Sequence, residues 1–122
     1  MNTEIIKKVS KQLNYDIPVD YQNFYLSQES LHIKPNMFKI NNNEKMISYL
    51  FSMDENSKTY IIKFQSFDSQ YEKQLIPFAE LEFGDLLCFD RNSNEIIYYN
   101  HELDIIEKVA DNWHQLEGNL YN

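Results

Sequence analysis

Three blocks of sequence decide the fold: Leu75-Ile76-Pro77-Phe78-Ala79, Gly84-Asp85-Leu86-Leu87-Cys88-Phe89-Asp90 and Ile96-Ile97-Tyr98-Tyr99-Asn100-His101-Glu102. The first is an apolar run that contains a proline, the second follows a glycine, and the third ends in polar and charged groups. Between the last two lies Asp90-Arg91-Asn92-Ser93-Asn94, whose short polar side chains are typical of a hairpin loop. We therefore expect Glu95–His101 to return antiparallel to the strand before it.

The backbone chemistry of these blocks predicts where each strand lies in the sheet. Pro77 has no N–H to give to a neighbouring strand, so Leu75–Ala79 is predicted to be an edge strand or a strand end. Gly84 has no Cβ atom and permits a bulge or a positive φ at the entry to the next strand. Residues 86–89 place apolar side chains on both faces, which predicts a central strand covered on both sides.

The residues before these blocks predict two N-terminal helices. Apolar side chains recur every four positions in residues 5–13, and Asn2 or Thr3 can cap that helix. Pro18 fixes a turn or a first helical position. The stretch Asp20–Leu26 then predicts a short second helix with its aromatic side chains on one side.

The other segments give weaker signals. Met37–Ile40 indicates a short strand, and apolar residues at helical spacing in residues 46–53 predict a third helix. Residues 59–67 suit a strand by propensity and a helix by the spacing of their aromatic side chains; the spacing favours a helix, and the choice stays open. A further apolar segment starts at residues 105–109, and the spacing in residues 113–121 predicts a C-terminal helix that closes the core.

Length and composition favour one cytoplasmic domain. The 122 residues suffice for one domain and are too few for two of ordinary size. The lone Cys88 cannot form an internal disulfide and lies in an apolar strand pattern, so a reducing compartment fits best. Residues 1–25 show no signal-peptide pattern, and no apolar run is long enough to span a membrane.

The formal net charge of −8 is concentrated in the last third of the chain. Residues 1–79 carry equal numbers of acidic and basic residues, whereas residues 80–122 carry ten acids against only Arg91 and Lys108. Such a field repels nucleic acid and membrane lipid and attracts basic partners. The simpler interpretation is that an acidic surface keeps the domain soluble.

Several pieces of sequence, in a fixed order, resemble one family across nearly the whole chain. After a helix come Ile17-Pro18-Val19-Asp20-Tyr21, Phe24 and Leu26, then Leu75 to Glu80, Gly84-Asp85, a strand ending in Asp90, and Tyr98-Tyr99-Asn100-His101-Glu102 before a final helix. This order is similar to the SUKH superfamily, the Smi/Knr-type domain of the fungal cell-wall assembly regulator and of many bacterial toxin-immunity proteins. Two segments differ: Ser27-Gln28-Glu29-Ser30 stands where the family often has an Asn-Gly turn, and Leu81-Glu82-Phe83 where members tend to have an acid with Pro or Gly.

The resemblance implies an α+β fold in which N-terminal helices and a C-terminal helix pack on a central, mostly antiparallel sheet, in a single domain over residues 1–122. It also implies an immunity protein without enzymatic activity that binds a cognate toxin in the producing cell. The acidic charge favours a basic toxin, for example a nuclease. The alternative is an intracellular regulatory or scaffold domain like the fungal regulator. Exposed aromatic residues would support a weak homodimer.

Two acidic clusters mark the candidate site. Glu80, Glu82 and Asp85 lie around Gly84, and Glu102, Asp104 and Glu107 form a second cluster after the strand that ends at His101. In an antiparallel hairpin, Asp85 at the start of one strand lies beside residues 101–102 at the end of the other. The two clusters can therefore merge into one docking surface with aromatic anchors such as Phe83, Tyr98 or Tyr99. The predicted partner-binding residues are Glu80, Glu82, Phe83, Asp85, Tyr98, His101, Glu102 and Asp104.

Other chemistry at these residues has less support in the sequence. His101-Glu102 with Asp104 and Asp85 can be drawn as a metal site or an acid–base pair, but the spacing follows no established pattern. We find no phosphate-binding loop or nucleophile elbow, and we expect no cofactor, metal or catalytic residue. For each carboxylate alone, a solvated surface position remains the simpler interpretation.

Overall fold

The computed structural model describes residues 3–122, which form helices, two short 3₁₀ helices (η1 and η2) and strands. The bounds are α1 Thr3–Leu13, α2 Val19–Ser27, β1 Met37–Ile40, β2 Asn43–Leu50, η1 Ile61–Phe64, β3 Leu75–Leu81, η2 Glu82–Gly84, β4 Leu86–Asp90, β5 Ile96–Asn100, β6 Ile105–Ala110 and α3 Trp113–Asn119. The two predicted N-terminal helices and the C-terminal helix are confirmed. A cap from Asn2 lies outside the described residues.

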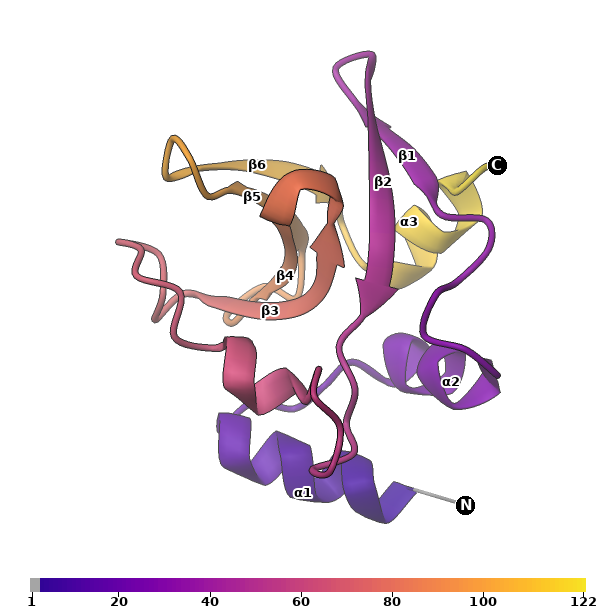
Figure 1. Ribbon diagram of the computed structural model, residues 1–122, viewed down its shortest axis with the longest axis vertical. Coiled ribbons are helices and arrows are strands. Elements are labelled where there is room, and N and C mark those ends of the chain that lie inside the picture. The colour runs from indigo at the N-terminus through magenta and orange to yellow at the C-terminus, as the bar shows by residue number, and fades with distance from the viewer. Residues whose placement is uncertain (1–2) are drawn as a thin grey trace.

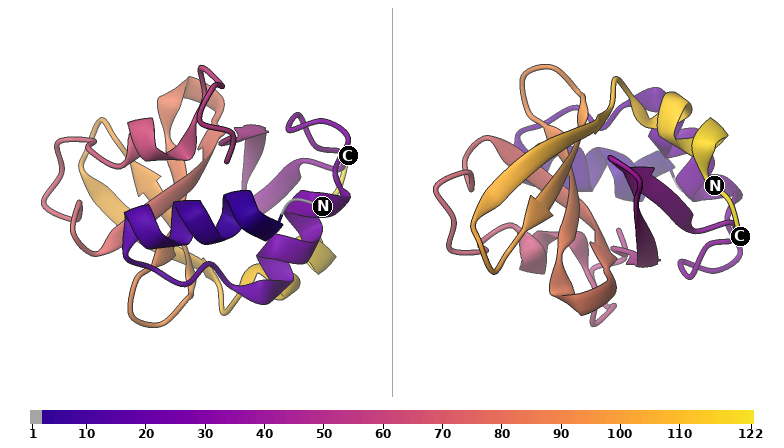
Figure 2. Two further views of the ribbon diagram at one scale, coloured as in Figure 1. Left: turned by 90° about the horizontal axis from the view of Figure 1, so that it is seen from below. Right: turned by 90° about the horizontal axis from the view of Figure 1, so that it is seen from above.

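The strands form one antiparallel sheet in the order β1-β2-β3-β4-β5-β6, so each strand pairs with its neighbour in sequence. The sheet curls strongly and approaches a barrel (Figure 1), while α1 and α2 lie below it and α3 lies beside β1 (Figures 1 and 2). The buried side chains make one core that includes residues of all three helices and all six strands. The predicted α+β class with a central antiparallel sheet is confirmed.

The predicted central strand and hairpin are also confirmed. β4 pairs with β3 on one side and with β5 on the other, and all its residues from Leu86 to Phe89 are buried. Cys88 is fully buried and free. Asp90 closes the hairpin loop, because its carboxylate accepts hydrogen bonds from the backbone N–H groups of Asn92 and Ser93. Such a side-chain bond to nearby backbone is the mechanism expected for this loop.

The prediction of an edge strand at Leu75–Ala79 is wrong, because β3 lies inside the sheet and pairs with both β2 and β4. The ladder to β4 shifts register between Pro77 and Ala79. At such an irregularity the missing N–H of proline disturbs less of the ladder, which is how an interior strand tolerates it. The Pro77 carbonyl also accepts a hydrogen bond from the Gln65 side chain at 3.0 Å.

The predicted third helix over residues 46–53 is wrong as well, because residues 43–50 form β2. A register shift between Ile47 and Tyr49 in the pairing with β3 breaks the regular alternation of the strand. Ile47 and Leu50 are both fully buried although they are three residues apart. A bulged strand therefore produces the spacing that is typical of a helix.

The structure also describes the segments whose sequence signals were weaker, including residues 59–67, where the choice between helix and strand was open. Of the stretch 59–67, only Ile61–Phe64 is helical, as the 3₁₀ helix η1. The apolar segment after residue 104 is the edge strand β6, and α3 follows it. The chain does not stay helical to Tyr121, which instead exchanges two backbone hydrogen bonds with Met37 of β1, at 2.9 and 3.0 Å. The C-terminal residues therefore cover part of the free edge of β1.

An aromatic cluster joins the helices to the sheet. The Tyr21 ring of α2 lies 4.9 Å from the Phe78 ring, 5.3 Å from the Phe89 ring and 5.1 Å from the Trp113 ring, measured between centroids. Asp20 links α2 to α3 as well, because its carboxylate accepts a hydrogen bond from the His114 backbone N–H. Asp20 and Tyr21 therefore hold α2 against α3 and the sheet.

Candidate functional site

The turn between β3 and β4 starts the candidate site. It contains η2, and it is closed by a hydrogen bond from the Leu81 N–H to the Asp85 carbonyl at 2.8 Å. Gly84 has a φ of +83°, and a Cβ atom there would lie 3.4 Å from the ring of His101. The predicted positive φ is confirmed, and glycine suits this position because residues with a Cβ atom rarely adopt this backbone conformation.

Asp85 connects this turn to the end of β5. Its carboxylate accepts hydrogen bonds from the Tyr98 hydroxyl at 2.6 Å and from the His101 backbone N–H at 3.1 Å. It also lies 2.8 Å from His101 Nδ1. The β4–β5 hairpin therefore brings Asp85 and His101 together, as the sequence predicted. With these partners the Asp85 carboxylate has a structural part, because it ties the turn to β5.

Tyr98 is the buried member of this group. Only 3% of the residue is exposed, and burial together with the Asp85 carboxylate raises the pKa of its phenol, which therefore stays a hydrogen-bond donor. Lys45 of β2 lies 4.8 Å above the ring and 3.4 Å from the hydroxyl. We therefore expect Tyr98 to position Asp85 and not to act as an exposed anchor. The sequence offered no signal for Lys45, which lies 53 positions away.

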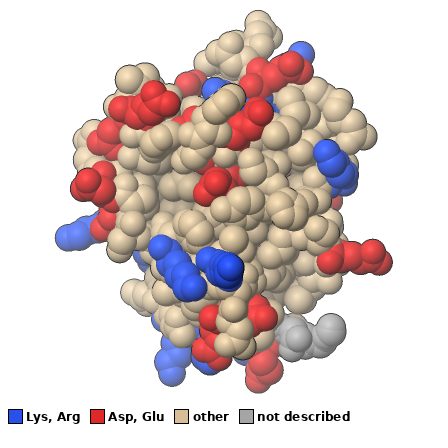
Figure 3. All heavy atoms as spheres, viewed as in Figure 1, with Lys and Arg blue, Asp and Glu red and all other residues tan. Residues whose placement is uncertain are grey.

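Exposed residues surround this network. Phe83 is 85% exposed, and Glu82, His101 and Glu102 are also exposed. We call Glu82, Phe83, Asp85, His101 and Glu102 the acidic face. Figure 3 shows several acidic side chains over the upper part of the molecule, where η2 and the turn between β5 and β6 lie, while others lie at its lower end among basic side chains. Leu103, 67% exposed, adds a second apolar group in that turn.

Two predicted site residues, Glu80 and Asp104, lie on the face of the sheet opposite to Tyr98. Tyr98 and Tyr99 are neighbours in β5 and point to opposite faces. Asp104 accepts a hydrogen bond from the Tyr99 hydroxyl at 2.8 Å, and Glu80 shares the Tyr99 face because both stand opposite Leu86. The structure thus brings together the five residues of the acidic face, but not Glu80 or Asp104.

Asp104 joins the β5–β6 turn to the segment before β3. Besides Tyr99, the Ser69 hydroxyl and the Gln70 amide donate hydrogen bonds to its carboxylate. The bonds from Ser69 and then Tyr99 are the main reasons why the pKa of Asp104 lies below its usual value. Hydrogen bonds to the charged form favour that form. The Asp104 carboxylate is therefore occupied by contacts within the chain.

We expect the Asp104→Asn variant to be less stable than the wild type above about pH 5, with a difference that shrinks as the pH falls below about 4. A carboxyl with a lowered pKa in the folded state contributes stability above its unfolded pKa and loses it as the pH falls through the folded pKa. Urea denaturation at both pH values measures this. Ser69→Ala should act in the same direction, and a difference independent of pH would contradict the assignment.

The acidic face offers little chemistry of its own. Within residues 3–122, no group of three or more His, Cys, Asp or Glu side chains converges in a way that could hold a metal ion. His101 and Asp85 are a pair only, and the lone thiol, Cys88, is fully buried with its pKa raised by burial. The arrangement is suited to binding: a rigid turn that presents an exposed ring among carboxylates.

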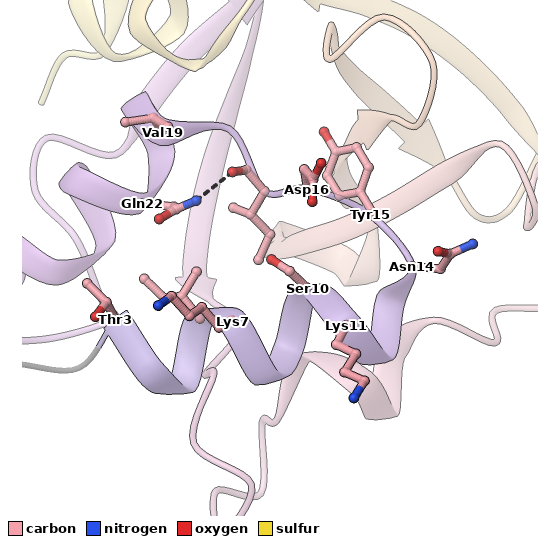
Figure 4. A pocket seen from close by; sticks show the side chains of 11 residues that line it. Thr3, Lys7, Ser10, Lys11, Asn14, Tyr15, Asp16, Val19 and Gln22 are labelled. Atoms are coloured by element: carbon pink, nitrogen blue, oxygen red, sulfur yellow. Dashed lines mark hydrogen bonds between the residues drawn. The ribbon is translucent and has the colours of Figure 1, made fainter.

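A separate groove lies between α1 and the connection to α2, with a volume of about 720 Å³. Lys7, Lys11 and Asp16 line it, and the Gln22 amide crosses it to bond the Ile17 carbonyl at 2.7 Å (Figure 4). Its lining mixes basic and acidic groups and includes none of the predicted site residues. Sequence periodicity does not reveal such a groove, because a helix and an irregular connection form it together.

Comparisons with known proteins assign the chain to a family. The model of the SMI1/KNR4 family (SUKH-1) matches residues 1–117, which is almost the whole chain. No curated protein and no solved structure matches it. Among the described residues, no helix is long and apolar enough to cross a membrane.

Proposed function

Because the chain belongs to the SMI1/KNR4 family (SUKH-1), we propose that it is an immunity protein that binds a cognate toxin domain and holds it inactive inside the producing cell. The observation that carries the proposal is the acidic face: exposed Glu82 and Glu102 beside an exposed Phe83 at one end of the sheet. Exposed aromatic side chains surrounded by polar groups are typical of protein-binding surfaces.

The charge of this surface indicates the chemistry of the partner. All of the net charge of −8 comes from residues 80–122, which include the whole acidic face. Acidic rim residues accelerate encounter with a basic surface and disfavour acidic partners. A toxin domain that binds phosphates, such as a nuclease, has a basic surface of this kind. We therefore propose a basic toxin domain as the partner.

Inhibition would occur by stoichiometric binding and not by chemistry. The turn that presents Phe83 is tied to β5 by the three contacts of Asp85 with Tyr98 and His101. A surface that is already ordered before binding loses little conformational entropy in the complex. The carboxylates at its rim would speed association, and the apolar contact would slow dissociation.

Family membership also admits an intracellular regulatory or scaffold domain, and a growth experiment separates the two functions. The toxin domain to express with it is the C-terminal domain of a large secreted protein, where the gene directly upstream encodes one. An immunity protein restores growth when it is expressed together with this domain, whereas a regulatory domain does not. Failure to restore growth, with both proteins present at comparable levels, would contradict the immunity function. Growth without the toxin domain is the control for expression burden.

A further inference from the structure

Phe83 has an unusual backbone conformation. Its φ of 64° and ψ of 18° lie in the left-handed region, and Gly84 after it also has a positive φ of 83°. Glycine adopts such angles freely and asparagine tolerates them, but a bulky aromatic residue seldom does. Strained backbone of this kind persists only where the surrounding structure imposes it, and it gathers at functional sites.

Groups other than the Phe83 side chain hold this conformation. The turn is fixed by the hydrogen bond from the Leu81 N–H to the Asp85 carbonyl and by the hydrogen bonds that the Asp85 carboxylate accepts from Tyr98 and His101. The Phe83 side chain gives no packing in return, because the residue is 85% exposed. In the isolated chain, an aromatic residue at this position therefore strains the backbone and gains no packing for its side chain.

The surroundings of Phe83 are acidic. A hollow of about 60 Å³ beside it is lined by residues of β2 and of the β3–β4 turn, with three carboxylates among them: Glu44, Lys45, Met46, Leu81, Glu82 and Asp85. An apolar ring that stands above carboxylates fits a partner surface in which an apolar pocket is ringed by Lys or Arg side chains. No exposed residue elsewhere in residues 3–122 combines this degree of aromatic exposure with a left-handed backbone.

We propose that Phe83 is the anchor of the complex: its ring, presented by a turn whose backbone is already ordered, inserts into an apolar pocket of the toxin domain whose rim is basic. This inference rests on the proposed function and names the partner surface that the acidic face would bind. A turn whose backbone is ordered before binding loses little backbone freedom in the complex, and an aromatic side chain has only two χ angles to fix, which makes Phe83 an effective central contact. Asp85 and His101 then act as positioning residues for Phe83.

The test is the Phe83→Asn variant, measured for stability and for binding to a purified, catalytically inactivated form of the upstream-encoded toxin C-terminal domain. Because asparagine tolerates the left-handed region and no buried contact is lost, urea denaturation should show unchanged or increased stability. The affinity should fall at least about 30-fold, mainly through faster dissociation, as expected for a central anchor. Val19→Asn, another substitution of an exposed apolar residue, is the matched control and should bind as the wild type does.

The outcomes separate this inference from the proposed function. If the wild type does not bind the toxin domain, the proposed function fails. If the wild type binds and the Phe83→Asn variant binds within about threefold of it, only the anchor role fails. A marked loss of stability in the variant would show that Phe83 is structural and would also overturn the inference. A wild-type dimer that the substitution abolishes would identify a second copy as the occupant instead.

Discussion

Replacement of Glu82 and Glu102 with lysine is expected to slow association with the basic toxin domain by one to two orders of magnitude at low salt. Both residues are exposed on the acidic face, and each substitution turns an attractive charge into a repulsive one. Electrostatic steering accounts for association rates that exceed those of neutral pairs by about 10²-fold or more. Stopped-flow or surface-based binding kinetics measure the rate directly.

The choice of these two residues follows from the structure. Asp85 also belongs to the acidic face, but charge reversal there would break the contacts with Tyr98 and His101 and disturb the turn itself. Glu82 and Glu102 make no side-chain ion pair within residues 3–122, so their replacement tests charge alone.

A matched control keeps the same change in net charge. The Glu4→Lys and Glu29→Lys double variant also replaces two exposed glutamates, but these lie on α1 and after α2, at the other end of the molecule (Figure 1). Its association rate should change much less. Added salt should reduce the difference between the wild type and the Glu82/Glu102 variant, because it screens exposed charges. Equal association rates for the two double variants would contradict the proposal that the acidic face is the docking surface.

The Trp113→Ala variant is expected to lose about 3–5 kcal/mol of unfolding free energy. Trp113 is fully buried, and its ring lies 4.8 Å from the Phe24 ring and 5.1 Å from the Tyr21 ring. Its side chain thus joins α3 to α2 and to the sheet. The free energy of unfolding of native proteins is about 5–15 kcal/mol in total, so the variant should lose a large part of its stability. Urea denaturation monitored by circular dichroism measures the loss.

Two further variants define what the Trp113 side chain contributes. The indole Nε1 makes no hydrogen bond with any described residue, so Trp113→Phe loses packing volume only and should cost less than the alanine variant. His114→Ala changes an exposed side chain in the same helix and should stay within about 0.5 kcal/mol of the wild type. A loss below about 1 kcal/mol for Trp113→Ala would contradict a core closed by α3.

The parts of the fold that follow from local chemistry could be predicted from the sequence. The unbroken apolar run in residues 86–89, the polar loop after them and the helical stripe of α1 each depend on neighbours in the chain, and all three are confirmed. The errors at Pro77 and in β2 have a common cause. Both involve a register shift, and a bulge is defined by the partner strand, which local periodicity does not contain.

In the candidate site, too, contacts between neighbouring strands could be predicted from the sequence, whereas contacts between distant segments could not. Hairpin geometry was sufficient to predict that Asp85 and His101 meet, because both belong to the β4–β5 hairpin. The placement of Asp104 depends on Ser69, which is 35 positions away, and no spacing rule contains that contact. The left-handed conformation of Phe83 also lacks a sequence signal of its own, since a phenylalanine next to a glycine usually indicates nothing more than a turn.

Titration of the toxin domain's activity with the purified chain tests most directly whether the protein neutralises by binding. If it does, activity should fall in proportion to the amount of chain added and reach zero near a one-to-one ratio. The folded state of the chain is checked in the same samples by circular dichroism. Toxin activity that persists in the presence of a several-fold excess of folded chain would contradict the proposal.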